Sequence, residues 1–317
     1  MHALFNSLSV ARICLGVLWL SLPATGMAAS IPEMEAGCAS GDLDNCTDLA
    51  TAKARGADTS LDLPAAIELW RRACDGGVGR ACFNLGLSHS RGAGVPKSAS
   101  DALAFYERGC NLAHLGSCTN LGAALEAHGT PESDVRALVA YTRACEGAQH
   151  LACENGAKMY DAGRGGARDA TKAANYYRVA CEGGERDSCS LLGLLYLDGD
   201  GVAPDPEQAK ALLERACDSG DMFGCAVLGV AYDTARGLAR DYEEAARQYQ
   251  RACDGGLASS CARLAVLTRC GLGVPKSRGE ASALWSQACA GDDEKACTTR
   301  LPRTGAECES SEFLHSR

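Results

Sequence analysis

The sequence predicts an all-α protein in which helix pairs of about 36 residues stack into an α/α solenoid. A pair of cysteines eight positions apart, such as Cys217 and Cys225, occurs eight times along the 317 residues. Successive pairs are 36 residues apart, except for one step of 35. Each repeat also shows apolar residues at helical spacing. Self-similarity at a fixed period indicates stacked units, because each unit needs its neighbours to bury its apolar face.

The chain begins with a predicted secretory signal peptide at residues 1–29. Arg12 is followed by an apolar run of ten residues, Ile13–Leu22, and by small residues that end in Ala28-Ala29. This arrangement is typical of a cleaved signal. The alternative is a membrane anchor, but a membrane-spanning helix needs about 20 apolar residues. We therefore expect no membrane span and a secreted or periplasmic protein.

Residues 30–301 are expected to form the solenoid, which begins with a half-repeat at Ile31–Ser40. Seven helix pairs should follow. In the repeat that serves as our template, Asp187–Leu197 is the first helix, and the loop DGDGVAPD follows it. The second helix, Glu207–Asp218, opens after Pro206, because proline suits a first helical turn. A lone final helix at Asp293–Leu301 should cap the stack, followed by a polar tail at residues 302–317.

Small and large residues alternate on one face of each second helix, which predicts close helix packing. Alanine stands eight positions before the first cysteine of seven pairs: Ala66, Ala102, Ala137, Ala173, Ala209, Ala245 and Ala281. A large side chain stands four positions before it: Trp70, Tyr106, Tyr141, Tyr177, Leu213, Tyr249 and Trp285. The first helices supply a leucine–glycine step, as in Leu192-Gly193. We interpret these columns as core and not as a cofactor site.

The regular cysteine pairs are expected to form disulfides that join one repeat to the next. Zinc sites usually place cysteines about two to four residues apart, which does not fit these pairs. Disulfides imply an oxidising compartment. The expected bridges are Cys38–Cys46, Cys74–Cys82, Cys110–Cys118, Cys145–Cys153, Cys181–Cys189, Cys217–Cys225, Cys253–Cys261 and Cys289–Cys297. Cys270 and Cys308 lie outside the series, and we predict a ninth bridge between them; free thiols or an intermolecular bridge are the alternatives.

These residues resemble Sel-1-like repeats, which are relatives of tetratricopeptide repeats. The resemblance is carried by the L-G-x-x-Y motif at Leu192–Tyr196, the G-x-G-V loop at Gly271–Val274 and the A-x-x-x-Y/W pattern of the second helices. The cysteine spacing is similar to that of the Helicobacter cysteine-rich protein family. The resemblance covers about residues 31–301. It implies a right-handed superhelix whose first helices line the concave face, and a protein that binds peptides or other proteins there. It also implies an alternative, β-lactamase or penicillin-binding activity.

The residues offer no catalytic constellation for that alternative. A serine β-lactamase needs S-x-x-K, and no lysine here has a serine three positions before it. The histidines share no spacing that would suggest a metal site: His89, His114, His128 and His150. Asp198-Gly199-Asp200-Gly201 is an incomplete calcium loop. We therefore expect no catalytic residue, no metal and no cofactor. The formal net charge of −9, with both signs scattered, argues against nucleic acid as a partner.

One polar column suggests a binding surface. Asparagine stands two positions after the second cysteine at Asn84, Asn120 and Asn155. Its amide both donates and accepts hydrogen bonds, so it suits a peptide backbone. The alternative is that these side chains tie adjacent helices together. The leading hypothesis is a monomeric scaffold that binds a peptide or protein in its concave groove. A structural spacer and the β-lactamase remain as alternatives.

Overall fold

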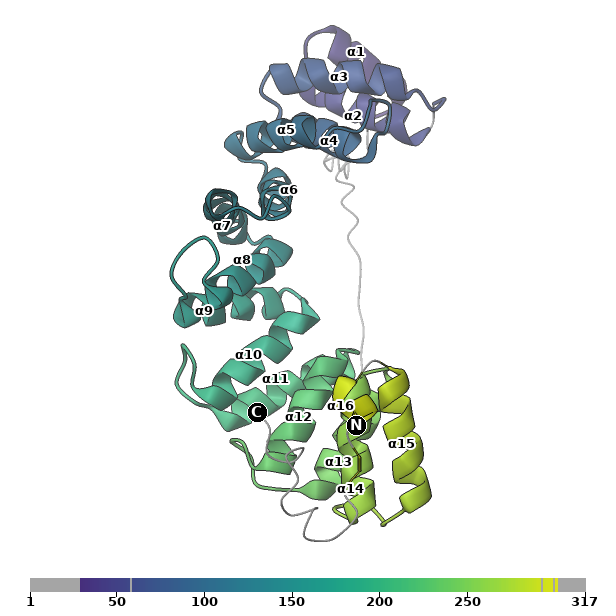
Figure 1. Cartoon of the computed structure of the whole chain (residues 1–317). Helices are drawn as coiled ribbons and strands as arrows, with labels where there is room; N and C mark the ends of the chain where they lie inside the picture. Colours follow the sequence, from purple (N-terminus) through teal and green to yellow (C-terminus); the bar gives the residue numbers. More distant parts are fainter. Residues whose placement is uncertain (1–28, 58, 292, 299, 302–317) are drawn as a thin grey trace, which may run out of the picture.

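The computed structural model describes residues 29–301 except for 58, 292 and 299. The predicted signal peptide therefore falls, but for Ala29, outside the described residues, as do the predicted tail and Cys308. The described chain contains helices and no strand. The α/α solenoid and the succession of helix pairs predicted from the sequence are confirmed (Figure 1).

Seven helix pairs lie between a short helix at each end. The end helices are α1 (Ile31–Ala39) and α16 (Glu294–Thr298). The first helices of the pairs are α2 (Leu43–Arg55), α4 (Gly79–Arg91), α6 (Leu115–Glu126), α8 (His150–Ala162), α10 (Arg186–Asp198), α12 (Met222–Thr234) and α14 (Ala258–Cys270). The second helices are α3 (Leu63–Asp75), α5 (Ala99–Asn111), α7 (Pro131–Glu146), α9 (Ala170–Glu182), α11 (Pro206–Asp218), α13 (Tyr242–Asp254) and α15 (Arg278–Ala290).

Each second helix begins at a side chain that caps its first turn. The cap accepts a hydrogen bond from the backbone N–H three positions on, which satisfies one of the free N–H groups of a helix start. The caps are Asp62, Ser98, Thr130, Asp169, Asp205, Asp241 and Ser277. The start of every second helix is thus fixed by one residue of its own sequence.

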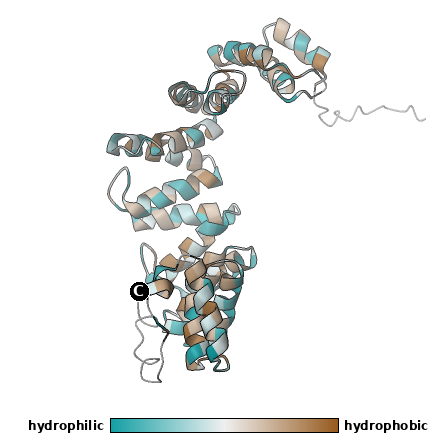
Figure 2. Ribbon diagram, turned by 45° about the vertical axis from the view of Figure 1, so that its right-hand side comes forward, coloured by the Kyte–Doolittle hydropathy of each residue, from teal (hydrophilic) through white to brown (hydrophobic). Residues whose placement is uncertain are grey.

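The glycines of the first helices make room for the large side chains of the second helices. A Cβ atom on Gly86 would lie 2.5 Å from the ring of Tyr106, and one on Gly229 would lie 2.6 Å from the ring of Tyr249. The seven alanines of the second helices are buried beside them. The small–large columns therefore form the core, and Figure 2 shows the resulting mixture of apolar and polar residues along each helix.

The G-x-G loops hold neighbouring repeats together. Gly199 ends α10 with a φ of 69°, a left-handed conformation that suits glycine. Gly201 also has a positive φ, and a Cβ there would lie 2.2 Å from the backbone carbon of Ala170 at the start of the preceding second helix. Close approach to the previous repeat explains the second glycine of the motif.

The stack is curved, and the first helices lie on its inner side (Figure 1). Contacts between α4 and α6, between α6 and α8, and between α10 and α12 are more extensive than those between any two successive second helices. In a curved stack the elements nearest to each other line the inner surface. The first helices therefore form the inner, concave surface of the solenoid.

The final helix is shorter than predicted. We expected Asp293–Leu301, but α16 spans only Glu294–Thr298, after Asp293 has accepted a hydrogen bond from the N–H of Ala296. In the sequence Leu301 precedes Pro302, and a residue before proline disfavours the helical conformation. Among the described residues no helix is long and apolar enough to cross a membrane.

Candidate functional site

Eight disulfides close the turns between repeats. Each joins the end of one helix to the start of the next first helix, with Cα atoms 4.5–4.8 Å apart. They occur at the eight regular pairs, from Cys38–Cys46 to Cys289–Cys297. Cys270 is also disulfide-bonded. Its pairing with Cys308 stays a prediction, because Cys308 lies outside the described residues. So many bridges indicate an oxidising, extracytoplasmic environment.

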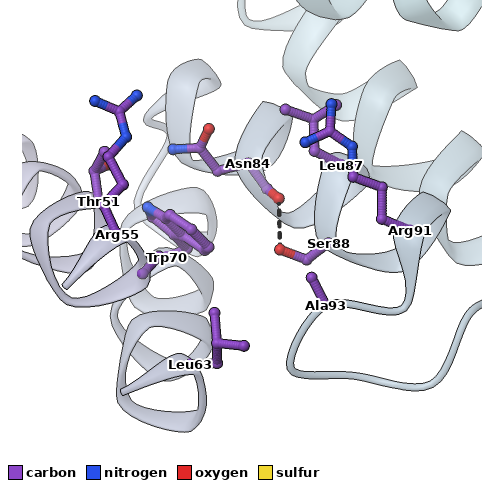
Figure 3. A pocket seen from close by; sticks show the side chains of 10 residues that line it. Thr51, Arg55, Leu63, Trp70, Asn84, Leu87, Ser88, Arg91 and Ala93 are labelled. Carbon is purple, nitrogen blue, oxygen red and sulfur yellow. Dashed lines mark hydrogen bonds between the residues drawn. The ribbon is translucent and has the colours of Figure 1, made fainter. Parts of the chain in front are cut away.

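A pocket of about 200 Å³ opens at the N-terminal end of the inner surface, between α2, α3 and α4 (Figure 3). We call it the Trp70 pocket. Its residues are Thr51, Ala54, Arg55, Leu63, Trp70, Asn84, Leu87, Ser88, Arg91 and Ala93. Leucine and alanine side chains supply apolar walls, whereas Arg55, Arg91 and Asn84 supply hydrogen-bond donors. No carboxylate lines the pocket.

Trp70 is the most buried large side chain of the pocket. It is 6% exposed, and its indole N–H has no hydrogen-bond partner within the described part of the chain. A buried donor without an acceptor is costly and rare in folded proteins. Trp70 is therefore a side chain of this pocket whose hydrogen-bond donor is left unused by the described part of the chain.

The three predicted asparagines lie on first helices, half-buried and in different surroundings. Asn84 lines the Trp70 pocket, and the hydroxyl of Ser88 donates to its backbone carbonyl over 2.9 Å (Figure 3). Asn120 is half-buried on α6. Asn155 is half-buried on α8, near the Tyr141 hydroxyl that donates to Glu126. The structure therefore does not bring the three together in one pocket.

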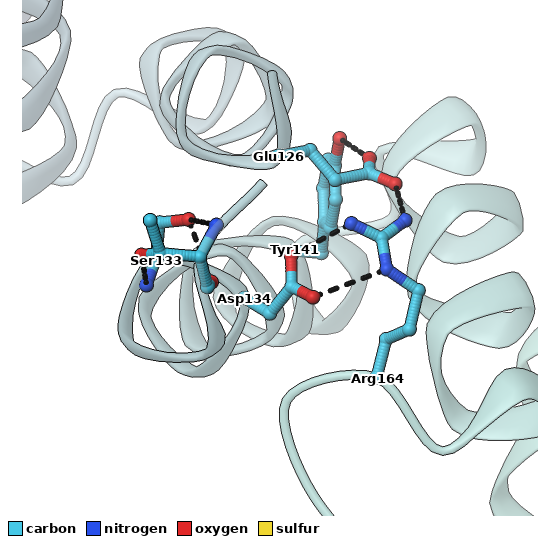
Figure 4. Close-up of polar contacts among 6 residues, drawn as sticks. Glu126, Ser133, Asp134, Tyr141 and Arg164 are labelled. Atoms are coloured by element: carbon cyan, nitrogen blue, oxygen red, sulfur yellow. Dashed lines mark hydrogen bonds and ion pairs between the residues drawn. The ribbon is translucent and has the colours of Figure 1, made fainter. Parts of the chain in front are cut away.

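A polar cluster joins α6, α7 and the loop after α8 (Figure 4). Arg164 donates to Asp134 over 2.7 Å and to Glu126 over 2.5 Å, and the Tyr141 hydroxyl donates to Glu126 over 2.9 Å. The hydrogen bonds to Asp134 and Glu126 raise the pKa of Arg164, while burial raises the pKa of Tyr141. Each of these charges is paired within the fold. We therefore interpret the cluster as a brace and not as a binding site.

A second pocket, of about 390 Å³, lies beside the second helix α7 and so away from the inner surface. Val135 and Val139 line it and are 50% and 65% exposed. It contains Arg143 and Glu146 but no buried polar group that lacks a partner. It is the weaker candidate among the described residues.

His89 and His114 take structural positions in the fold. His89 is buried beside Asp101, 3.6 Å away, and stacks on Phe105. His114 caps α6 by accepting a hydrogen bond from the N–H of Ser117 over 3.1 Å. Burial and the charge of Arg80 lower the pKa of His114. The described residues contain no group of side chains that could hold a metal ion.

Several arginines of the second helices tie one repeat to the next. Arg108 donates to Asp75, and Arg251 donates to Asp218, each over 2.7 Å. Arg215 donates to the backbone carbonyl of Cys181 over 2.5 Å. Each of these three arginines therefore has a structural partner in the preceding repeat.

Comparison with known proteins gives one family. The model of the Sel1 repeat matches residues 46–78, 79–114, 146–185, 186–221, 223–257 and 258–293. The unmatched segment between the second and third matches contains α6 and most of α7. This is the repeat with the shorter 35-residue step and the Arg164 cluster.

Two of the similar solved structures, with TM-scores above 0.5, show the same fold. A Sel1 repeat protein from Oxalobacter formigenes is 24% identical over 84% of this chain and 78% of its own, with a TM-score of 0.63. The protective antigen c5321 of uropathogenic Escherichia coli is 22% identical over 85% of this chain and 66% of its own, with a TM-score of 0.54. Cysteine-rich protein B of Helicobacter pylori is 27% identical over 42% of this chain and 96% of its own, with a TM-score of 0.34. No curated protein matches the chain.

Proposed function

The chain belongs to the Sel1 repeat family, and on that premise we propose that it is an extracytoplasmic scaffold that binds an extended peptide segment of a partner on its inner surface. The observation that carries the proposal is the Trp70 pocket, where a buried indole N–H without a partner meets apolar walls and two arginines. Residues 1–29 would direct export, and the disulfides would form in the oxidising compartment that follows.

The N-terminal half of the inner surface suits a ligand better than the C-terminal half. Asn84, Asn120 and Asn155 are half-buried and polar, so they offer hydrogen bonds to a peptide. At the same position two of the C-terminal repeats carry Leu191 and Val227, which is 8% exposed, whereas the last carries Arg263. Apolar side chains that pack between first helices leave few polar groups for a ligand backbone. We therefore place the peptide along α2, α4, α6 and α8.

The test uses the full exported protein, purified with its disulfides intact, and a library of random decapeptides. We expect selected peptides to bind, and Asn84→Ala to weaken binding by about fivefold, which is the roughly 1 kcal/mol of one hydrogen bond. Asn111→Ala is the matched control, because Asn111 is an exposed asparagine at the end of the second helix α5. Equal losses in both variants, or no binding at all, would contradict the proposal.

The β-lactamase alternative has no observation in its favour. The eight regular cysteine pairs are oxidised, so their sulfur atoms are not available as thiolate nucleophiles. Turnover of the chromogenic β-lactam nitrocefin by the same preparation, but not by a boiled sample, would support the β-lactamase alternative.

A further inference from the structure

The large side chains of the second helices meet a fixed position on the first helix of the same repeat. That position lies eight residues after the second cysteine. It supplies an acceptor for three of the four tyrosines: Ser90 for Tyr106, Glu126 for Tyr141 and Asp233 for Tyr249. Where the large residue is Leu213, the position is Leu197, and the two belong to one apolar cluster. In these four repeats the two positions match in polarity.

The Trp70 repeat breaks this match. Its position on the first helix is Ala54, which has no acceptor, although the indole of Trp70 carries a donor. Ala54 and Trp70 both line the pocket. The Trp70 repeat thus lacks the oxygen atom that three other repeats have at this position of the first helix. The indole nitrogen is buried, and the position without an oxygen lines the pocket, so a ligand in the pocket can provide that oxygen.

The charged residues around the pocket indicate whether the ligand's oxygen atom is neutral or anionic. Arg55 and Arg91 line it, and neither forms an ion pair with a carboxylate of the described residues. Ten other arginines of the described residues do form one, as Arg80 does with Asp48 and Arg108 with Asp75. Two guanidinium groups that lack counter-ions, an indole N–H and the Asn84 amide all favour an anionic acceptor.

The walls and the size define the rest of the ligand. Leu63 and Leu87 give the pocket apolar sides. Its volume of about 200 Å³ is below the roughly 300–1,000 Å³ typical of drug-sized sites, so it suits a single residue. An apolar side chain and a carboxylate on the same residue occur together only at a peptide C-terminus. An internal Asp or Glu would leave the apolar walls unfilled.

We propose that the Trp70 pocket binds the free C-terminal carboxylate and the apolar last side chain of a partner peptide. The carboxylate accepts from the Trp70 N–H and lies between Arg55 and Arg91, while the last side chain packs on Leu63 and Leu87. This inference rests on the proposed peptide-binding function and adds the end of the peptide that is recognised.

The sharpest variant is Ala54→Asp, which provides an oxygen of the chain's own where Asp233 provides one for Tyr249. It should fold and should weaken peptide binding at least tenfold, because its carboxylate takes the ligand's place. Ala104→Asp is the matched control, an exposed alanine on the second helix α5 with the same change of charge. It should bind like the parent protein. Arg91→Gln, at an exposed position, should also weaken binding about tenfold. It tests the pocket independently if the Ala54→Asp protein does not fold.

The probes are decapeptides tethered at their N-termini, made once with a free C-terminal carboxylate and once with an amide. We expect the amide to bind at least tenfold more weakly than the acid. The indole N–H resonance of Trp70 should shift on binding of the acid, with Trp285 as internal reference.

Each other outcome overturns a defined part of the argument. Equal binding of acids and amides would overturn the C-terminal assignment and leave the scaffold function intact. Selection of internal Asp or Glu regardless of the terminus would do the same. Absence of binding by either set would overturn the scaffold function as well. An Ala54→Asp protein that folds and binds normally would show that the pocket is not the site.

Discussion

His114 makes the start of α6 sensitive to pH. Its ring nitrogen accepts from the N–H of Ser117, and burial together with the charge of Arg80 lowers its pKa. A lowered pKa means that the folded state disfavours the proton, which would remove the acceptor of the cap. The stability that neutral His114 contributes is therefore fully present above the unfolded pKa of about 6.5 and is lost as the pH falls through the lower folded pKa.

We predict that His114→Asn removes this part of the pH dependence. Asparagine caps helices well and does not titrate between pH 5 and 8. The free energy of unfolding, measured in urea across that range, should fall less steeply toward acid in the variant than in the parent. The other histidines are present in both proteins and cancel in the comparison. Parallel curves for the two proteins would show that His114 is not responsible.

At the residue scale, the spacing in the sequence predicts which residues occupy equivalent positions in the repeats, but not which side chains surround them. Spacing from the cysteines predicted that Trp70 and Tyr106 would occupy equivalent positions, and both are buried. Their environments differ because the position eight residues after the second cysteine is Ala54 in the Trp70 repeat and Ser90 in the Tyr106 repeat. A comparison of the two positions in the sequence would have predicted this difference. The different surroundings of Asn84 and Asn155 depend on side-chain packing, which spacing alone does not show.

At the scale of the helix, the α6–α7 pair departs from the other repeats. Only Ala127–Gly129 and the cap Thr130 separate α6 from α7, and α7 is 16 residues long. Arg164 from the following loop reaches back to both helices of this pair (Figure 4). We infer that this brace holds a pair that lacks the usual G-x-G loop.

Arg164→Gln should therefore loosen this pair locally. Arg164 is 40% exposed, so solvent screens its two ion pairs, and we expect a loss of about 1 kcal/mol. Hydrogen exchange should accelerate in the first turn of α7 and the last turn of α6. Arg136→Gln is the control, because Arg136 forms a more exposed pair with Glu107. Equal acceleration in both variants would remove the special role of Arg164.

Helix positions were predictable because the signals that start and stop helices are local. The template helices Asp187–Leu197 and Glu207–Asp218 are each found within one residue at either end, at Arg186–Asp198 and Pro206–Asp218. The 35-residue step marked the unusual repeat in the sequence. The partners of Arg164 could not be read there, because they lie 30 and 38 positions away in the chain.

At the scale of the whole molecule, each repeat contacts chiefly its neighbours, so stability is approximately a sum of repeat and interface terms. Eight described disulfides lie at the junctions between repeats. In the chain-entropy model a bridge that closes so short a loop stabilises by roughly 2–3 kcal/mol. The effect of losing one bridge should then depend on where the bridge lies in the stack.

We predict different consequences for a central bridge and a terminal one. Replacing Cys181 and Cys189 with alanine weakens a junction with complete repeats on both sides. Hydrogen exchange should rise in α9 and α10, and unfolding in urea should separate into two steps because the two halves lose part of their coupling. Replacing Cys38 and Cys46 makes the same chemical change at the end of the stack. There exchange should rise only in α1 and α2, and the main transition should keep its midpoint. If both variants instead lost stability as a whole in a single transition, the solenoid would be one cooperative unit, and a peptide bound near Trp70 would stabilise the distant C-terminal repeats as well.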